Sequence, residues 1–508
     1  MRLIKYLLVF LSVLLAQLPL ALASSAAGGK WLRADSRHFV IYSSGSSQEL
    51  QQFSANLERF NALLRLKFNV PEDENPNKLV VYFLAGQESV GQLVRNAAGF
   101  YSPDSEGTFA VANRDKKTEK TDLSGMEVLF HEYAHHFMFR NFSYPYPAWY
   151  VEGFAEYYAT AEFKKDDTWA MGKPPYYRAY GLIAGAHMSV DKILFGEPNP
   201  RDAELADIYY GRAWLLVHML TTKPEYKGKL TAYFAAIRAG KNEQEAAAQV
   251  FGDLHTFDQA LDHYLDGKLT FWSTKVPLVA NTEMTVSEVD QISGQLIILR
   301  LYRMGVRDPA RTRAALRAMA KANPQRADVW YELAMAERIT TKDASKADDA
   351  LAEKQAETAI DQALAADPKH VRANVLKADI LMHRLQDTGD AQPADWSKAR
   401  AYLVKANAGA VNDPLVLVEW YESFELQGRA PTKLAQDALA RAFELQPELP
   451  ELRVKFAFDL AHQGRFDEAI RLVEFLAHDP HDSENGKKLL KTLQDMKARA
   501  SAPTKAAA

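Results

Sequence analysis

Cysteine is absent from the 508 residues of this chain. Its absence excludes disulfide bonds, thiolate metal ligands, a cysteine nucleophile and a lipid-modified N-terminal cysteine. Any metal ion must therefore be held by nitrogen and oxygen atoms. If the chain is exported, the lack of cysteine favours a bacterial periplasm over a disulfide-rich extracellular setting.

The chain also has little excess of charge of either sign, with a formal net charge of -4 at pH 7. This mild acidity offers no electrostatic footprint for nucleic acid, and we expect no nucleic-acid partner. No stretch is similar enough to a phosphate-binding glycine loop or a serine nucleophile elbow to support either chemistry. A chain this long should form about two to four domains.

Long apolar runs are limited to one, at the N-terminus. Arg2 and Lys5 precede it, and the residues ALA at 21–23 end it with the small-x-small pattern of a signal-peptidase site. The pattern predicts a signal peptide over residues 1–23 and a periplasmic or secreted mature protein. The alternative is an uncleaved anchor, because the run is close to membrane-spanning length. No later run is comparable, so we expect no membrane span after cleavage.

Strand-like segments are concentrated near the N-terminus. Residues 38–44, 78–86 and 107–113 are rich in β-branched and aromatic residues, and residues 46–68 have apolar residues at helical spacing. This pattern predicts a small α/β subdomain over residues 24–121.

The rest of the chain reads as mostly helical. We expect a helical subdomain, a linker, a region of helical repeats and a disordered tail, over residues 122–275, 276–289, 290–498 and 499–508 respectively. The predicted fold class is α+β, with an all-α superhelix in the second half.

Prolines close helix-like runs at regular distances in the second half, with spacings of 44, 46, 33 and 33 residues between Pro324, Pro368, Pro414, Pro447 and Pro480. The clearest unit, residues 452–480, has Gly464 at an inter-helix turn and small residues at Ala457 and Ala469. These features resemble the tetratricopeptide repeat family, whose unit has about 34 residues. The resemblance implies a concave face that binds a protein partner or substrate. The alternative is a helical spacer.

The stretch FHEYAHHF, at 130–137, contains an H-E-x-x-H pattern formed by His131, Glu132 and His135. Four residues along a helix turn through about 400°, so both histidines project from one face and can share a tetrahedral ion. Glu132 can take a proton from a water molecule beside them. His136 points off this face, and we interpret it as a packing or surface residue.

A second amphipathic helix is expected at 148–158, with Glu152 and Glu156 one turn apart. Together the two helices resemble the gluzincin metallopeptidases, especially the aminopeptidase-N-like families, in which W-x-x-E-G-x-A follows H-E-x-x-H. Here that motif is formed by Trp149, Glu152, Gly153 and Ala155. The resemblance implies an α+β zincin fold with one Zn²⁺ ion, held by His131, His135 and Glu152.

The resemblance also implies roles for Glu156 and for a tyrosine, and each role has an alternative. Glu156 is either an acid that orients a ligand histidine, where relatives commonly have Asp, or a solvated carboxylate. Residues 209–220 resemble the helix that starts with the catalytic tyrosine, which makes Tyr210 the oxyanion donor and places Ala213 at a small position. Tyr209 is the alternative donor, and either tyrosine could instead be a packing residue. His218 lies too far along this helix.

One family feature is missing, the G-x-M-E-N strand whose Glu binds a substrate's free amine. Residues 107–113 contain no acid, and the triplet at 125–127 lies too close to His131. Aminopeptidase activity is therefore not supported, although an edge strand could still align an extended peptide. The leading hypothesis is an exported zinc metallopeptidase acting on a peptide or protein. The alternative is an inactive peptidase-like scaffold that works through its repeats.

Overall fold

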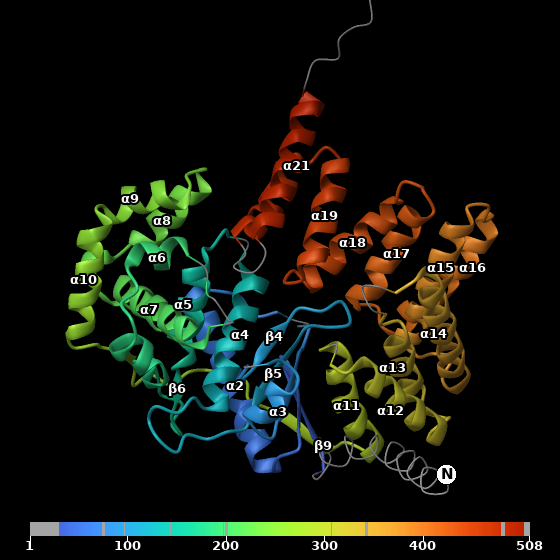
Figure 1. Ribbon diagram of the computed structural model, residues 1–508, viewed down its shortest axis with the longest axis horizontal. Coiled ribbons are helices and arrows are strands. Elements are labelled where there is room, and N and C mark those ends of the chain that lie inside the picture. The colour runs from blue at the N-terminus through green and yellow to red at the C-terminus, as the bar shows by residue number, and fades with distance from the viewer. Residues whose placement is uncertain are drawn as a thin grey trace, which may run out of the picture.

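The computed structural model describes residues 30–501, apart from residues 74–76, 96, 143, 197, 199–201, 306, 341–343 and 479–482. The chain is a mixed α+β protein with a small central sheet, and its described elements from residue 291 onward are all helices (Figure 1). The predicted signal peptide lies outside the described residues, as do Pro480 and residues 502–508. The first residues of the predicted tail, 499–501, are the end of the last helix.

The central sheet has six strands in the order β4-β5-β3-β2-β1-β9. Its middle strands β2, β3 and β5 run parallel, whereas β4, β1 and β9 are antiparallel to their neighbours. The middle strands are those that the sequence predicts. In chain order the bounds are Leu32–Ser36 (β1), Phe39–Ser43 (β2), Leu79–Leu84 (β3), Phe100–Ser102 (β4), Phe109–Asn113 (β5) and Met284–Glu288 (β9).

Helix α2 (Ser47–Phe68) covers one face of this sheet. It begins at a capping box formed by Ser46 and Glu49, and ends where Asn69 adopts the left-handed conformation. Its apolar stripe, including Phe60, joins strand residues such as Val81 in the main core. Parallel strands covered on both faces carry continuous apolar runs, which explains why these strands were recognisable.

Strand β9 lies within residues 276–289, which the sequence predicts as a linker. It pairs with β1 from Leu32↔Glu288 to Ser36↔Met284. Helix α11 (Gln291–Met304) follows and covers the second face of the sheet. Ile297 of that helix packs with Trp31 in a separate cluster. Residues 284–304 therefore form part of the sheet and its cover. The sequence does not predict β9 because its residues, MTVSE, are mostly exposed and lack an apolar pattern.

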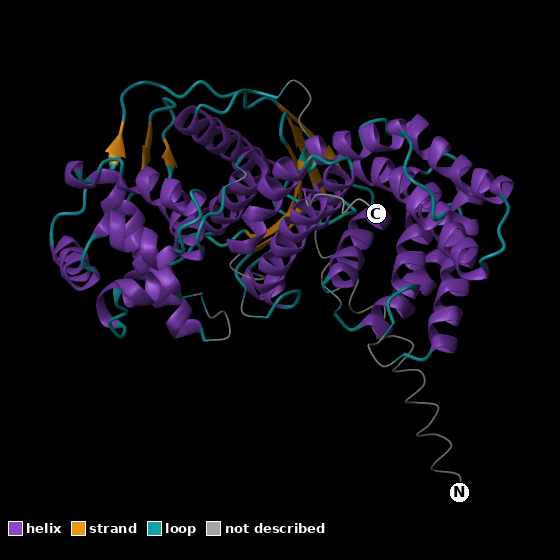
Figure 2. Cartoon of the chain, turned by 90° about the horizontal axis from the view of Figure 1, so that it is seen from above, coloured by secondary structure: helices purple, strands orange, loops and turns teal. Residues whose placement is uncertain are grey.

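A group of helices lies on the other side of α2 and carries a separate three-stranded sheet, β6-β7-β8, which Figure 2 shows apart from the central one. The elements of this group are Gly125–Asn141 (α4), Ala148–Ala159 (α5), Glu162–Phe163 (β6), Trp169–Met171 (β7), Tyr176–Arg178 (η1), Tyr180–Ala184 (η2), Val190–Phe195 (α6), Ala203–Thr222 (α7), Pro224–Tyr226 (η3), Lys229–Arg238 (α8), Glu243–Phe251 (α9), Leu254–Asp266 (α10) and Trp272–Ser273 (β8). The short helix α3 (Gln87–Gly91) packs instead with α11 on the second face of the central sheet.

The C-terminal half is built of helices that pack most closely in consecutive pairs. Gly464, at φ +80°, makes the predicted tight turn between α19 (Pro450–His462) and α20 (Phe466–Glu474). Ala457 and Ala469 are fully buried where these two helices meet. After α11, the bounds are Pro309–Ala322 (α12), Ala327–Glu337 (α13), Lys346–Ala366 (α14), Val371–Thr388 (α15), Pro393–Gly409 (α16), Pro414–Leu426 (α17), Lys433–Leu445 (α18), Pro450–His462 (α19), Phe466–Glu474 (α20), Phe475–His478 (η4) and Ser483–Ser501 (α21).

Within the described part of the chain, none of the helices has the length and apolar character that crossing a bilayer requires.

Candidate metal centre

Helix α4 is fixed at the end of strand β5. Ser124 caps its N-terminus in a capping box with Glu127. Gly125 is the first helical residue, and a Cβ atom there would lie 1.7 Å from the carbonyl oxygen of Asn113, the last residue of β5. The helix therefore leaves the sheet at one defined point, which sets the position of the histidines two turns further along.

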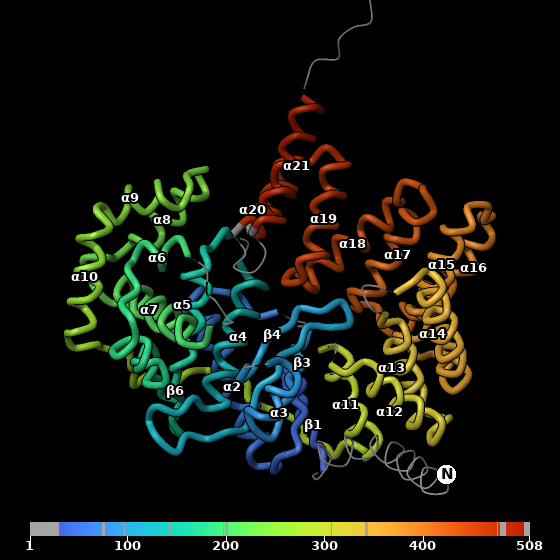
Figure 3. The backbone as a smooth tube through the Cα atoms, in the orientation of Figure 1, coloured from blue at the N-terminus to red at the C-terminus, as the bar shows by residue number. Residues whose placement is uncertain are grey.

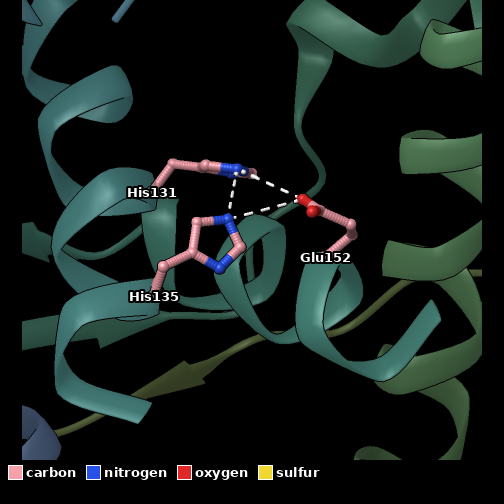
Figure 4. Close-up of side chains that lie close together, drawn as sticks. All are labelled: His131, His135 and Glu152. Atoms are coloured by element: carbon pink, nitrogen blue, oxygen red, sulfur yellow. Dashed lines mark hydrogen bonds and ion pairs between the residues drawn. The ribbon is translucent and has the colours of Figure 1, made fainter. Parts of the chain in front are cut away.

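The structure brings His131, His135 and Glu152 together (Figure 4). The Nε2 atoms of the two histidines lie 3.1 Å apart, and Oε2 of Glu152 lies 3.5 Å from each. Helix α4 supplies both histidines and α5 supplies the glutamate. All three side chains are largely buried, with 16%, 12% and 5% of their surface exposed.

This donor set fits zinc. A tetrahedral zinc ion bound at about 2.0–2.1 Å holds its ligand atoms about 3.3–3.4 Å apart, close to the separations found here. The electrostatics also favour a cation. Burial alone would lower the pKa of His131, but Glu152, Glu156 and Glu132 together raise it to about 9. The three glutamates thus favour a positive charge at His131. A bound divalent ion could supply this charge in place of a proton.

Glu132 lies close to both the predicted ligands and the edge strand β4. Burial raises the pKa of this carboxyl group, whereas His131, His135 and a hydrogen bond from the backbone of Tyr101 act in the opposite direction. Tyr101 belongs to β4, so the strand edge and the predicted base are in contact. A half-buried carboxylate at this place can exchange a proton with a neighbouring water.

Glu156 is fully buried, which rules out the solvated-carboxylate interpretation. Its Oε1 atom lies 3.5 Å from Nδ1 of His131 and accepts a 2.6 Å hydrogen bond from Arg178, while Tyr177 donates to Oε2 at 2.9 Å. The pKa of Glu156 is lowered because Arg178 and His131 outweigh the effect of burial. Glu156 is therefore placed to orient His131. Nδ1 of His135 has no hydrogen-bond partner among the described residues.

Sequence reasoning missed Tyr177 and Arg178. They lie in η1, an irregular segment followed by the π-helical turn η2, and no periodicity or motif marks them. The guanidinium of Arg178 also stacks on Tyr210, 4.9 Å from the ring centroid, and binds Asp207 of α7 at 3.0 Å. Arg178 thus ties α5 to α7 beside the predicted metal ligands.

The structure separates the two candidate tyrosines. The ring of Tyr210 faces His131, with centroids 6.3 Å apart, and burial and the charge of Glu152 raise its pKa. Tyr209 instead donates a hydrogen bond to the carbonyl of Gly196, 3.1 Å away. His218, further along α7, bonds to the carbonyl of Thr270 and so lies away from the predicted ligands. His136 is buried and its Nδ1 atom lies 3.2 Å from the hydroxyl of Tyr101.

The small residues of the two motifs meet each other. A Cβ atom on Gly153 would lie 2.5 Å from the carbonyl oxygen of Ala213 and 2.7 Å from a methyl group of Val217. Helices α5 and α7 therefore approach at their backbones, which keeps Glu152 and Tyr210 on facing surfaces. Glycine is needed here for space rather than for its backbone freedom.

We expect Gly153→Ala to lower the free energy of unfolding by about 1–2 kcal/mol. Overpacking of this kind costs about 1–3 kcal/mol, and the better helix propensity of alanine offsets up to about 1. Chemical denaturation of the two proteins measures the difference. The matched control is Gly91→Ala in α3, where the added methyl group meets nothing within 4 Å. A Gly153→Ala protein as stable as this control would contradict the close approach.

Comparisons with known proteins assign no family to this centre. No family model matches the chain, and no curated protein matches it. Among solved structures, a thermophilic TPR protein of Thermus thermophilus is similar to part of the chain at 17% identity and a TM-score of 0.31. The match covers 39% of this chain and 95% of that one. At such a low score the tetratricopeptide prediction continues to rest on the residues and the helix pairs.

Proposed function

We propose that this chain is an exported, zinc-dependent peptidase of gluzincin type, with a tetratricopeptide-like repeat domain in its helical half. One observation carries the proposal: the ligand atoms of His131, His135 and Glu152 have the mutual separations of a zinc tetrahedron. The H-E-x-x-H and W-x-x-E-G-x-A motifs support it. The substrate would be a peptide or protein, and the exposed parts of the repeat domain could bind a protein partner.

In this proposal each side chain has one task. A zinc ion held by the three ligands would supply Lewis acidity toward the scissile carbonyl and toward water. Glu132 would accept the proton of the attacking water and pass it to the leaving amine. Tyr210, whose raised pKa keeps its phenol protonated, would donate a hydrogen bond to the oxyanion that forms on the substrate. Glu156 would hold His131 in orientation through its Nδ1 side.

Metal analysis of the purified chain, residues 24–508, tests this proposal. We expect close to one zinc ion per chain, and loss of that zinc in Glu152→Ala because a two-histidine site binds far more weakly. The control is Glu162→Ala on β6, which removes an exposed glutamate outside the centre. Circular dichroism checks that all three proteins fold. A wild-type chain that stays metal-free with added zinc would refute the peptidase and favour the scaffold alternative.

A further inference from the structure

The loop at 103–108, between β4 and β5, extends from the sheet into the helical half. Figure 3 shows it in light blue, reaching in between the C-terminal helices. It continues directly from the edge strand beside Glu132. The loop contacts the side of the C-terminal helices that faces the sheet, and these contacts show what that side binds.

Glu106 is the most strongly held residue of this loop. Arg303 donates a hydrogen bond to each carboxylate oxygen, both at 2.8 Å, and the hydroxyl of Tyr331 donates a third at 3.0 Å. Arg372 donates to the backbone carbonyl of Glu106 at 2.9 Å. Bidentate arginine–carboxylate pairs are among the strongest hydrogen-bonded contacts in proteins. The three partners come from α11, α13 and α15, the first helices of three successive pairs.

The anchor continues into a network of charges around the buried residues Arg303 and Glu332. Arg303 is 6% exposed, and its Nε atom donates at 2.8 Å to Glu332, which is fully buried. Arg300 donates to the other oxygen of Glu332 at 2.5 Å. Two arginines therefore share the charge of Glu332, and Glu106 supplies the second negative charge. Without Glu106 one buried guanidinium would lose its balancing carboxylate.

The far side of the loop is held by the connection between α18 and α19. Gln446 donates to the carbonyl of Asp104 at 2.8 Å and to Thr108 at 2.9 Å, and Thr108 donates to Glu448 at 3.0 Å. The same connection reaches the metal-ligand helix. Arg140, in the last turn of α4, lies 3.2 Å from Glu448. The helical half thus binds both the loop and helix α4.

We propose that the inward face of α11, α13 and α15 is a receptor for loop 103–108 of the same chain, with Glu106 as its anchor. The helical half is then a clamp that fixes edge strand β4 and helix α4 relative to each other. A plain spacer would not need desolvated charges at this contact. An open peptide groove would leave Arg303, Tyr331 and Arg372 free for an external ligand, whereas here the chain's own carboxylate occupies them. This inference depends on the fold alone and not on peptidase activity.

Pulsed electron paramagnetic resonance tests the clamp. Because the chain has no cysteine, Gln51→Cys on α2 and Lys398→Cys on α16 give two exposed sites for spin labels. Metal-free protein is used, so that the result is independent of the proposed zinc site. In the Glu106→Gln variant, which keeps the shape but removes the charge, we expect the width of the distance distribution to at least double. Calorimetry should show one unfolding transition in the parent and two in the variant.

Two further variants complete the test. Glu88→Gln on α3 removes an exposed acid and should leave both measurements unchanged. Tyr331→Phe removes a single hydrogen bond to Glu106, and should broaden the distribution by less than Glu106→Gln does. If Glu106→Gln fails to fold, Tyr331→Phe is the variant that tests the clamp. A narrow distribution and a single transition in every folded variant would overturn the clamp.

Discussion

Substitution of Glu132 by Gln is expected to leave zinc bound while reducing peptide hydrolysis by about 10²–10⁴-fold, the usual contribution of a general acid–base group. Glutamine keeps the size of the side chain but cannot accept the proton of the attacking water. The measurement is cleavage of a quenched-fluorescence peptide library by the wild-type and variant chains, with the zinc content of each sample determined in parallel.

Zinc content separates loss of the base from loss of the metal. Glu132→Gln should match the wild type in bound zinc, whereas Glu152→Ala should lose both zinc and cleavage. If Glu132→Gln cleaves peptides at the wild-type rate with zinc bound, another residue must be the base. Contaminating peptidases are excluded when Glu152→Ala, purified in the same way, is inactive.

Replacement of Arg178 by Met should destabilise the protein by about 3–5 kcal/mol, because it leaves the fully buried Glu156 without its cationic partner. Adding Glu156→Gln to this variant should recover part of the loss, since the uncompensated charge disappears while the side-chain volume stays. Equilibrium denaturation of the two single variants and the double variant gives the coupling free energy. Zinc affinity should also fall, by about 10–100-fold, because Arg178 holds the carboxylate of Glu156 that is placed to orient His131.

A more exposed ion pair provides the comparison for Arg178. Arg59 binds Asp167 at 2.8 Å, but 44% of the Asp167 side chain is exposed. Arg59→Met should therefore cost only about 0–1 kcal/mol. A similar small cost for Arg178→Met would mean that Glu156 becomes protonated or hydrated at little expense, and that the pair does not hold α5 to α7.

The sequence predicts those parts of the fold in which residue types follow a regular pattern along a strand or helix. Strands β2, β3 and β5 carry continuous apolar runs because they are covered on both faces, and α4 carries its two predicted ligand histidines at a one-turn spacing. Strand β9 was not recognised, because an exposed edge strand of five residues has no distinctive pattern. Its pairing with β1 depends on a distant contact that local sequence does not record.

The candidate site likewise has residues that the sequence predicts and residues that only the structure reveals. His131, His135 and Glu152 are each identified by a motif, and the structure brings them together. Arg178 and Tyr177 belong to an irregular turn and are brought beside Glu156 only by tertiary packing. The choice between Tyr210 and Tyr209 also needed the structure, because adjacent helical residues differ by about 100° in direction and sequence does not fix the helix rotation.

The pairing of β1 with β9 has a consequence for the order in which the molecule can assemble. As the chain emerges from the ribosome, β1 can pair with β2 at once, but its other edge stays open until residues 284–288 have been made. The second face of the sheet also waits, because Trp31 packs against Ile297 of α11. An unpaired edge next to uncovered apolar surface is prone to aggregation. A nascent chain of this protein therefore needs protection from self-association until more than half of its length has been synthesised.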